Sequence, residues 1–233
     1  MPKAHSFPAS VVIGVWLNAA QTGSVSVTDS ANAIEVITEQ LVFNEADTER
    51  DLGIATWLDL VGQVKSMSTP VAVGLPVDGD PAGVPASILR RIVRDSGVVS
   101  IGVDLLLCQN SDGVWEIYRT PNKVMHYDLS QTRRNLTETI AAASQQLAAS
   151  DLTGDESDII ESLNSFQTAH LPPHLSKRST DALETAARIM IIARGAVEKS
   201  AALHSPSIDR KRTQILSQLI SESRSVLQSV VTN

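Results

Sequence analysis

The residues best suited to chemistry in this chain gather in one short stretch, residues 71–85, with the sequence VAVGLPVDGDPAGVP. An apolar run leads into a loop that carries two carboxylates, Asp78 and Asp80, and a helical pattern follows the loop directly. The region between a strand and the next helix is where α/β folds often bind ligands. We therefore predict a ligand-binding site in the loop and the basic turn after it, made of Asp78, Gly79, Asp80, Gly83, Arg90 and Arg91.

This loop permits more than one interpretation. Carboxylates at its first and third positions and Gly83 at its sixth are typical of a calcium loop, but Leu89 stands where calcium requires a bidentate Glu. A generic divalent-cation site, completed by a carboxylate from elsewhere in the fold, stays open. So does a rigid surface turn, because Gly permits unusual φ angles, Pro fixes φ and Asp bonds nearby amides. A phosphate ligand is disfavoured because two carboxylates would repel it.

Other residues that can do chemistry give weaker signals. Cys108, the only cysteine, lies in an apolar segment, which indicates a buried structural thiol rather than a nucleophile. His170 and His174 are separated by two prolines that prevent one continuous helix, so a polar loop is favoured over a metal site with His126 as a third ligand. No nucleophile elbow, zinc-protease, phosphate-loop or dinucleotide motif occurs. We predict no metal and no cofactor, and the sequence assigns no catalytic residue.

Three apolar segments with β character predict a small three-stranded sheet. They are residues 71–75, 98–108 and 114–118, and a turn signal at residues 110–113 joins the last two. Helical spacing predicts helices beside this sheet, over residues 9–22, over a face made of Ala33, Ile34, Ile37 and Leu41, and over residues 57–66.

After residue 128 the strand signals disappear and only helical patterns remain. Helices are predicted over residues 130–149, 155–167, 178–203 and 206–231. We therefore predict an α+β (or α/β) fold in which residues 1–128 form a mixed part that contains the acidic loop 76–85. Residues 129–233 form a helical bundle packed on that part, so that the two make one composite domain.

The last predicted helix carries an apolar stripe along one side. Its members are Ile208, Ile215, Leu216, Leu219, Ile220, Val226, Leu227, Val230 and Val231. The opposite side, which includes Glu222 and Gln228, is predicted to face solvent. Leaving the stripe in water would be costly at about 25 cal/mol per Å2. Two ways of burying the stripe stay open. It can pack against the chain's own helices, or it can form a homodimer interface, which the spacing of seven and four residues between successive apolar positions would suit.

Composition narrows the classes of function. The net charge is −7, and the excess of acid lies in residues 1–128, which hold 8 Lys and Arg against 15 Asp and Glu. Nucleic-acid binding needs a basic face, so we predict no nucleic-acid partner. The apolar run at residues 11–17 superficially resembles a signal peptide but is short, and no run approaches about 18 apolar residues. We predict a cytoplasmic protein with no membrane partner.

Three blocks of the chain resemble a family of uncharacterised actinobacterial proteins. They are residues 16–23 (WLNAAQTG), residues 75–85 (LPVDGDPAGVP), and residues 171–173 (LPP) leading into residues 186–189 (AARI). Related chains tend to read LPVPGDPxGLPG at the loop, so Asp78 stands here in place of a proline and Val84 in place of a leucine. The resemblance implies an actinobacterial, cytoplasmic protein and transfers no catalytic residue, because the family has no established activity.

These observations favour a non-enzymatic interaction or structural protein that forms a homodimer through its helices. The motivation is the absence of a catalytic motif together with ample helical surface. The alternative is a protein, or an enzyme, that binds a small molecule or a divalent cation through Asp78 and Asp80. A thermal-shift screen over metals and metabolites separates the two.

Overall fold

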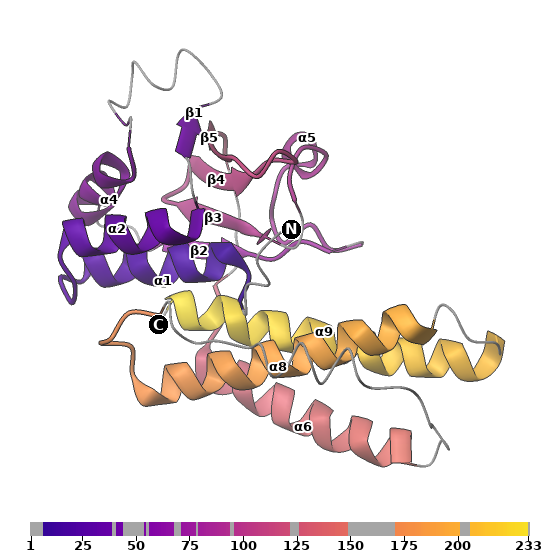
Figure 1. The fold of residues 1–233 in the computed structure, drawn as a ribbon. Coiled ribbons are helices and arrows are strands. Elements are labelled where there is room, and N and C mark those ends of the chain that lie inside the picture. The colour runs from indigo at the N-terminus through magenta and orange to yellow at the C-terminus, as the bar shows by residue number, and fades with distance from the viewer. Residues whose placement is uncertain are drawn as a thin grey trace.

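A computed structural model describes residues 7–38, 41–43, 54, 56–67, 71–77, 79–93, 96–121, 126–148, 171–200 and 206–232, without the side chains of 41–43, 147–148, 198–200 and 206–211. The fold is α+β, with a sheet and short helices in the first half of the chain and three long helices in the second (Figure 1). The long helices run together as one bundle beneath the sheet.

The sheet has five strands in the order β1-β5-β4-β3-β2. They are β1 (Leu41–Phe43), β2 (Val71–Gly74), β3 (Val98–Ile101), β4 (Leu105–Gln109) and β5 (Trp115–Arg119). Strands β2 to β5 pair antiparallel, whereas β1 pairs parallel with β5. Strand β2 therefore forms one edge of the sheet, directly before the acidic loop.

The α+β class and the C-terminal helical bundle are confirmed, but the predicted number of strands was too small. Residues 98–108 were predicted as one strand, and the structure divides them into β3 and β4 by a tight reversal at Gly102, whose φ is +64°. Only glycine adopts this left-handed conformation readily. Leu41 was assigned to a helix, yet it begins β1, because α2 already ends at Thr38.

The helices of the first half are α1 (Ala9–Gln21), α2 (Val27–Thr38), α4 (Trp57–Ser66) and the short α5 (Ala86–Leu89). Helix α1 is buried on nearly all sides, since ten of its 13 residues are buried. Helix α4 begins at a capping box, in which Thr56 and Asp59 bond each other's backbone amides. Helices α1, α2 and α4 build the main core with one face of the sheet, and α5 contributes to a smaller core on the other.

The second half contains α6 (Leu129–Ala148), α8 (Lys177–Ser200) and α9 (Pro206–Thr232), close to three of the four predicted helices. The fourth, over residues 155–167, lies outside the described residues. Helix α9 contacts α8, α6, α1 and β2, so it lies at the centre of the molecule. Among the helices that the structure describes, none has both the length and the apolar character that a membrane span requires.

The apolar stripe of α9 is covered by the chain itself. Its buried members are Leu216, Leu219, Val226, Leu227, Val230 and Val231. Ile215 and Ile220 pack against a cluster shared with α6 and α8, and the side chain of Ile208 lies outside the described part. The sequence left open whether the stripe packs within the chain or in a homodimer, and these eight residues pack within the chain.

Candidate functional site

The acidic loop is a tight reversal held by its own hydrogen bonds. The amide of Val77 donates to the carbonyl of Asp80 at 2.9 Å, and the amide of Asp80 donates back to Val77 at 3.1 Å. Gly79 supplies the left-handed conformation that the turn requires, with φ +83°. One carboxylate oxygen of Asp80 accepts from the amide of Ala82 at 3.0 Å. These bonds are those of an ordered turn with an Asp that caps it.

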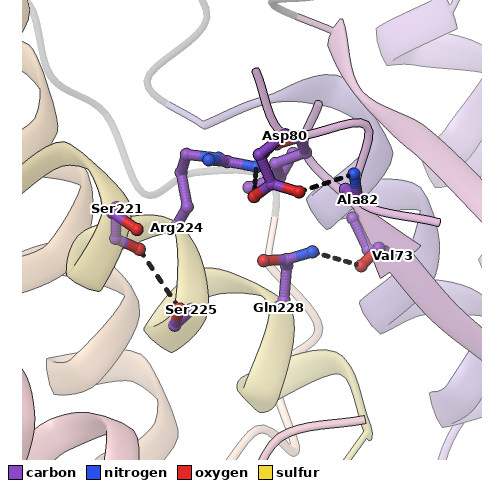
Figure 2. A network of polar contacts seen from close by, with 8 residues as sticks. Val73, Asp80, Ala82, Ser221, Arg224, Ser225 and Gln228 are labelled. Carbon is purple, nitrogen blue, oxygen red and sulfur yellow. Dashed lines mark hydrogen bonds and ion pairs between the residues drawn. The ribbon is translucent and has the colours of Figure 1, made fainter. Parts of the chain in front are cut away.

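The outer edge of β2 is closed by side chains rather than by another strand. Gln228 donates to the carbonyl of Val73 at 3.1 Å (Figure 2). Arg224 donates to the carbonyl of Leu75. From α1, the side-chain amide of Asn18 donates to the carbonyl of Val71 and accepts from its N–H, both at 3.2 Å. An edge strand presents unpaired backbone groups at every second residue. At Val71, Val73 and Leu75 a side chain from a helix bonds such a group.

Helix and strand geometry explain why two residues of α9 can do this. Arg224 and Gln228 are four residues apart, which separates them by about 6 Å along a helix. Val73 and Leu75 are two residues apart, which separates their outward carbonyls by about 6.6 Å along a strand. The two spacings match, so one helical turn of α9 satisfies successive acceptors of the edge.

Arg224 also connects α9 to the acidic loop. Its guanidinium lies 3.2 Å from the carboxylate of Asp80, and its side chain is only 4% exposed, against 57% for Asp80. Burial lowers the pKa of Arg224, while Asp80 opposes this shift and Arg194 adds to it. Burial and Asp80 raise the pKa of Tyr127, against the influence of Arg224. We call these four residues the polar corner.

A groove opens between α6 and α9. Its volume is about 570 Å3, and it is lined by Asn135, Glu138, Thr139, Ala142, Ala143 and Gln146 of α6 and by Gln214, Ile215, Gln218 and Glu222 of α9. The hydroxyls of Thr132 and Ser229 hydrogen-bond at 3.0 Å and join the two helices near the sheet. This contact pairs the start of α6 with the end of α9, so the helices run antiparallel along the groove.

The lining of this α6/α9 groove is polar, and its charges have one sign. Glu138 and Glu222 are acidic, five further lining residues are neutral amides or a hydroxyl, and no Lys or Arg is present among them. The apolar part consists of two alanines and Ile215. A concave surface of this kind suits a polar or cationic ligand better than an apolar one.

Residues 10–125 match the family model of the Rv1486c-like protein, N-terminal domain, and residues 130–227 match that of the Rv1486c-like protein, C-terminal domain. The chain belongs to the Rv1486c-like family. Membership of an uncharacterised family, which the resemblance implied, is thus confirmed. The use of the loop motif as a signature of that family stays a prediction. No curated protein and no solved structure matches the chain.

The two Rv1486c-like regions meet at the edge of the sheet. Asp80 and β2 belong to the N-terminal region, and Arg224 and Gln228 lie in α9, which the C-terminal region matches almost to its end. The ion pair and the hydrogen bond to Leu75 therefore join one region to the other, and Gln228, one residue after the matched range, adds the bond to Val73. The α6/α9 groove lies entirely within the C-terminal Rv1486c-like region.

Ligand binding by the six predicted site residues of this Rv1486c-like chain stays a prediction. Gly79, Asp80 and Gly83 share the loop, and Asp78 lies outside the described residues. Arg90 and Arg91 are exposed where α5 ends, and the structure pairs Asp80 with Arg224 instead.

Cys108 is a buried structural thiol, as the sequence indicates. It is 1% exposed, and burial, with a smaller contribution from the charge of Glu116, raises its pKa to about 12. His170 lies outside the described residues. Within the described part, His126 and His174 belong to no group of three or more His, Cys, Asp or Glu side chains that could hold a metal ion.

The sequence analysis singled out Asp80 but missed its partners in the polar corner, and it missed the groove. Arg224 was the available signal, since it is a charged residue two positions before Val226 in the apolar stripe. Gln228 was predicted to face solvent, and this was wrong: it is 3% exposed because it faces the backbone of β2. The groove had no sequence signal, because its residues read as the ordinary polar faces of two helices.

Proposed function

We propose that this protein is a non-enzymatic interaction protein that binds its ligand or partner in the α6/α9 groove. The observation that carries the proposal is the groove itself, whose volume of about 570 Å3 falls in the range of ligand-binding sites. Clefts between the helices of a bundle are common binding places, because helices hold side chains in fixed positions.

The acidic loop supports the alternative function less well. A cation at Asp80 would have to compete with Arg224, which lies 3.2 Å from the carboxylate, and with the amide of Ala82 at the other oxygen. The loop has a structural task that explains these contacts, because it anchors α9 at the edge of β2. We therefore place ligand binding in the groove and give the loop the role of a corner between the two halves.

Homodimerisation through helical faces stays a prediction. Its first motivation was the stripe of α9, whose described members pack within the chain, so a dimer would need another helical surface. Sedimentation of the chain at micromolar concentration tests it directly. A single species of 24.9 kDa removes the dimer, and a species of twice this mass supports it.

The test of the proposed function fills the groove. Ala142 is exposed and lines the groove, whereas its neighbour Ala141 is exposed on the same helix outside the lining. We expect compounds that raise the melting temperature of the wild-type chain in a broad fragment screen to lose this effect in Ala142→Trp and to keep it in Ala141→Trp. Hits that both variants retain, or a screen without hits, would contradict the proposal.

A further inference from the structure

We infer that the α6/α9 groove binds a linear aliphatic polyamine, that is, a flexible chain with two or more ammonium groups. This inference rests on the proposed function and names the class of ligand for the same groove. It is carried by the position of the two carboxylates, by the absence of Lys and Arg among the lining residues that the structure describes, and by the length of the remaining surface.

The register of the helices places the two carboxylates opposite each other. Thr132 and Ser229 are in contact at 3.0 Å and fix the antiparallel alignment of α6 and α9. Glu138 lies six residues after Thr132, about 9 Å along the axis, and Glu222 lies seven residues before Ser229, about 10 Å along it. The two glutamates therefore line the groove at nearly the same level, one on each wall.

Both carboxylates are open to a cationic partner. Neither Glu138 nor Glu222 forms a hydrogen bond or an ion pair with any side chain that the structure describes. Among the basic residues of α6 and α9 whose side chains the structure describes, Arg133, Arg134 and Arg212 do not line the groove, and Arg224 does not line it either; the side chains of Arg210 and Lys211 lie outside the described part. An ammonium group between the two walls would be attracted by both carboxylates and would relieve their mutual repulsion.

The rest of the groove suits an extended chain. From the level of Glu138, the lining continues for eight residues to Gln146, which is about 12 Å along the helix. Ala142 and Ile215 offer apolar contact for methylene groups. The amide oxygens of Gln214 and Gln218 can accept from a further ammonium group. Alternating charge, methylene and hydrogen-bonding contacts are those that a linear polyamine requires.

The test measures binding of spermidine, a linear triamine, to the full chain by calorimetry at constant ionic strength. We expect binding to the wild-type chain and at least tenfold weaker binding to Glu138→Gln/Glu222→Gln, because the amides keep the shape but lose both charges. The matched control is Glu35→Gln/Asp181→Asn, which removes two exposed charges outside the groove and should bind within twofold of the wild type. Glu138→Gln alone, at an exposed position, gives an intermediate loss if the double variant does not fold.

The possible results distinguish a wrong class of ligand from a wrong binding site. Equal weakening in the groove variant and in the control would mean a general charge effect and would overturn the inference, as would no spermidine binding. Binding of Mg²⁺ or of a lysine-rich peptide with the same dependence on Glu138 and Glu222, but not of spermidine, would overturn the polyamine and keep the groove. Hits from the fragment screen that Ala142→Trp abolishes would likewise keep the proposed function after failure of the polyamine.

Discussion

Arg224 should matter much more to stability than the aspartate with which it pairs. Its side chain is 4% exposed, and its guanidinium donates both to the carbonyl of the buried Leu75, directly after β2, and to the carboxylate of Asp80. Asp80 is 57% exposed and keeps a second hydrogen bond to the amide of Ala82. We therefore predict that Arg224→Met destabilises the chain clearly and that Asp80→Asn does so only slightly.

The magnitudes follow from what each change leaves behind. Arg224→Met leaves the carbonyl of Leu75 buried without its donor, which costs about 1–3 kcal/mol. Loss of the ion pair with the exposed Asp80 adds about 0.2–1 kcal/mol. Part of this is offset, because burial of the guanidinium is itself costly and its Nε has no partner among the described residues. We expect a net loss of about 1–3 kcal/mol for Arg224→Met and less than about 1 kcal/mol for Asp80→Asn.

Urea denaturation of the two single variants and the double variant measures these values and the coupling between the residues. Arg90→Met is the matched control, since Arg90 is an exposed arginine where α5 ends, and its effect should stay within about 0.5 kcal/mol. A neutral or stabilising Arg224→Met would refute the idea that this side chain closes the edge of β2. An Asp80→Asn variant as damaging as Arg224→Met would show that the ion pair, and not the backbone contact, carries the effect.

Three further predictions concern the same interior. Gln228→Met should lower the free energy of unfolding in urea by about 1–3 kcal/mol, because the buried carbonyl of Val73 loses its donor; an unchanged midpoint would contradict this. Gly14→Ala should lower the free energy of unfolding by about 1–3 kcal/mol in the same assay, since the added Cβ would lie 2.7 Å from the side chains of Val231 and Val73. A neutral result would mean that α9 and β2 can move apart at no cost. Cys108 keeps its proton to about pH 12 when folded, against 9.0 ordinarily, so the folded state binds more protons between these values and stability should fall as pH rises through them. Cys108→Ala should remove this part of the slope, and an identical alkaline profile in both chains would argue against a buried thiol.

The long helices were predictable because their apolar residues recur with the period of the α-helix over many turns. The strands were harder, since both faces of the sheet are buried and β2 and β3 show no alternation of polar and apolar residues. The division between β3 and β4 lies in a turn of three residues, 102–104, in which Gly102 takes the left-handed conformation. Strand β1 has only three residues, too few for any period to emerge.

The site was less predictable than the fold for a related reason. Sequence spacing indicates which side of a helix a residue lies on, but not what covers that side. Gln228 borders the apolar stripe of α9 and was predicted to face solvent, yet it bonds β2 at Val73. Arg224 bonds the carbonyl of Leu75, directly after β2, and no spacing in the sequence indicates this. The pairing of Asp80 with Arg224 joins positions 144 residues apart, and the groove depends on the spacing of two helices. Neither is encoded in a local pattern.

The most direct test of the account is to map where a ligand touches the chain. Spermidine added to the ¹⁵N-labelled protein should shift the backbone amide signals of residues 135–146 and 214–222, which line the α6/α9 groove. Shifts that concentrate instead in the acidic loop, residues 76–85, or at α2 and α4 in the other half of the chain, would contradict the claim that this groove is the binding surface.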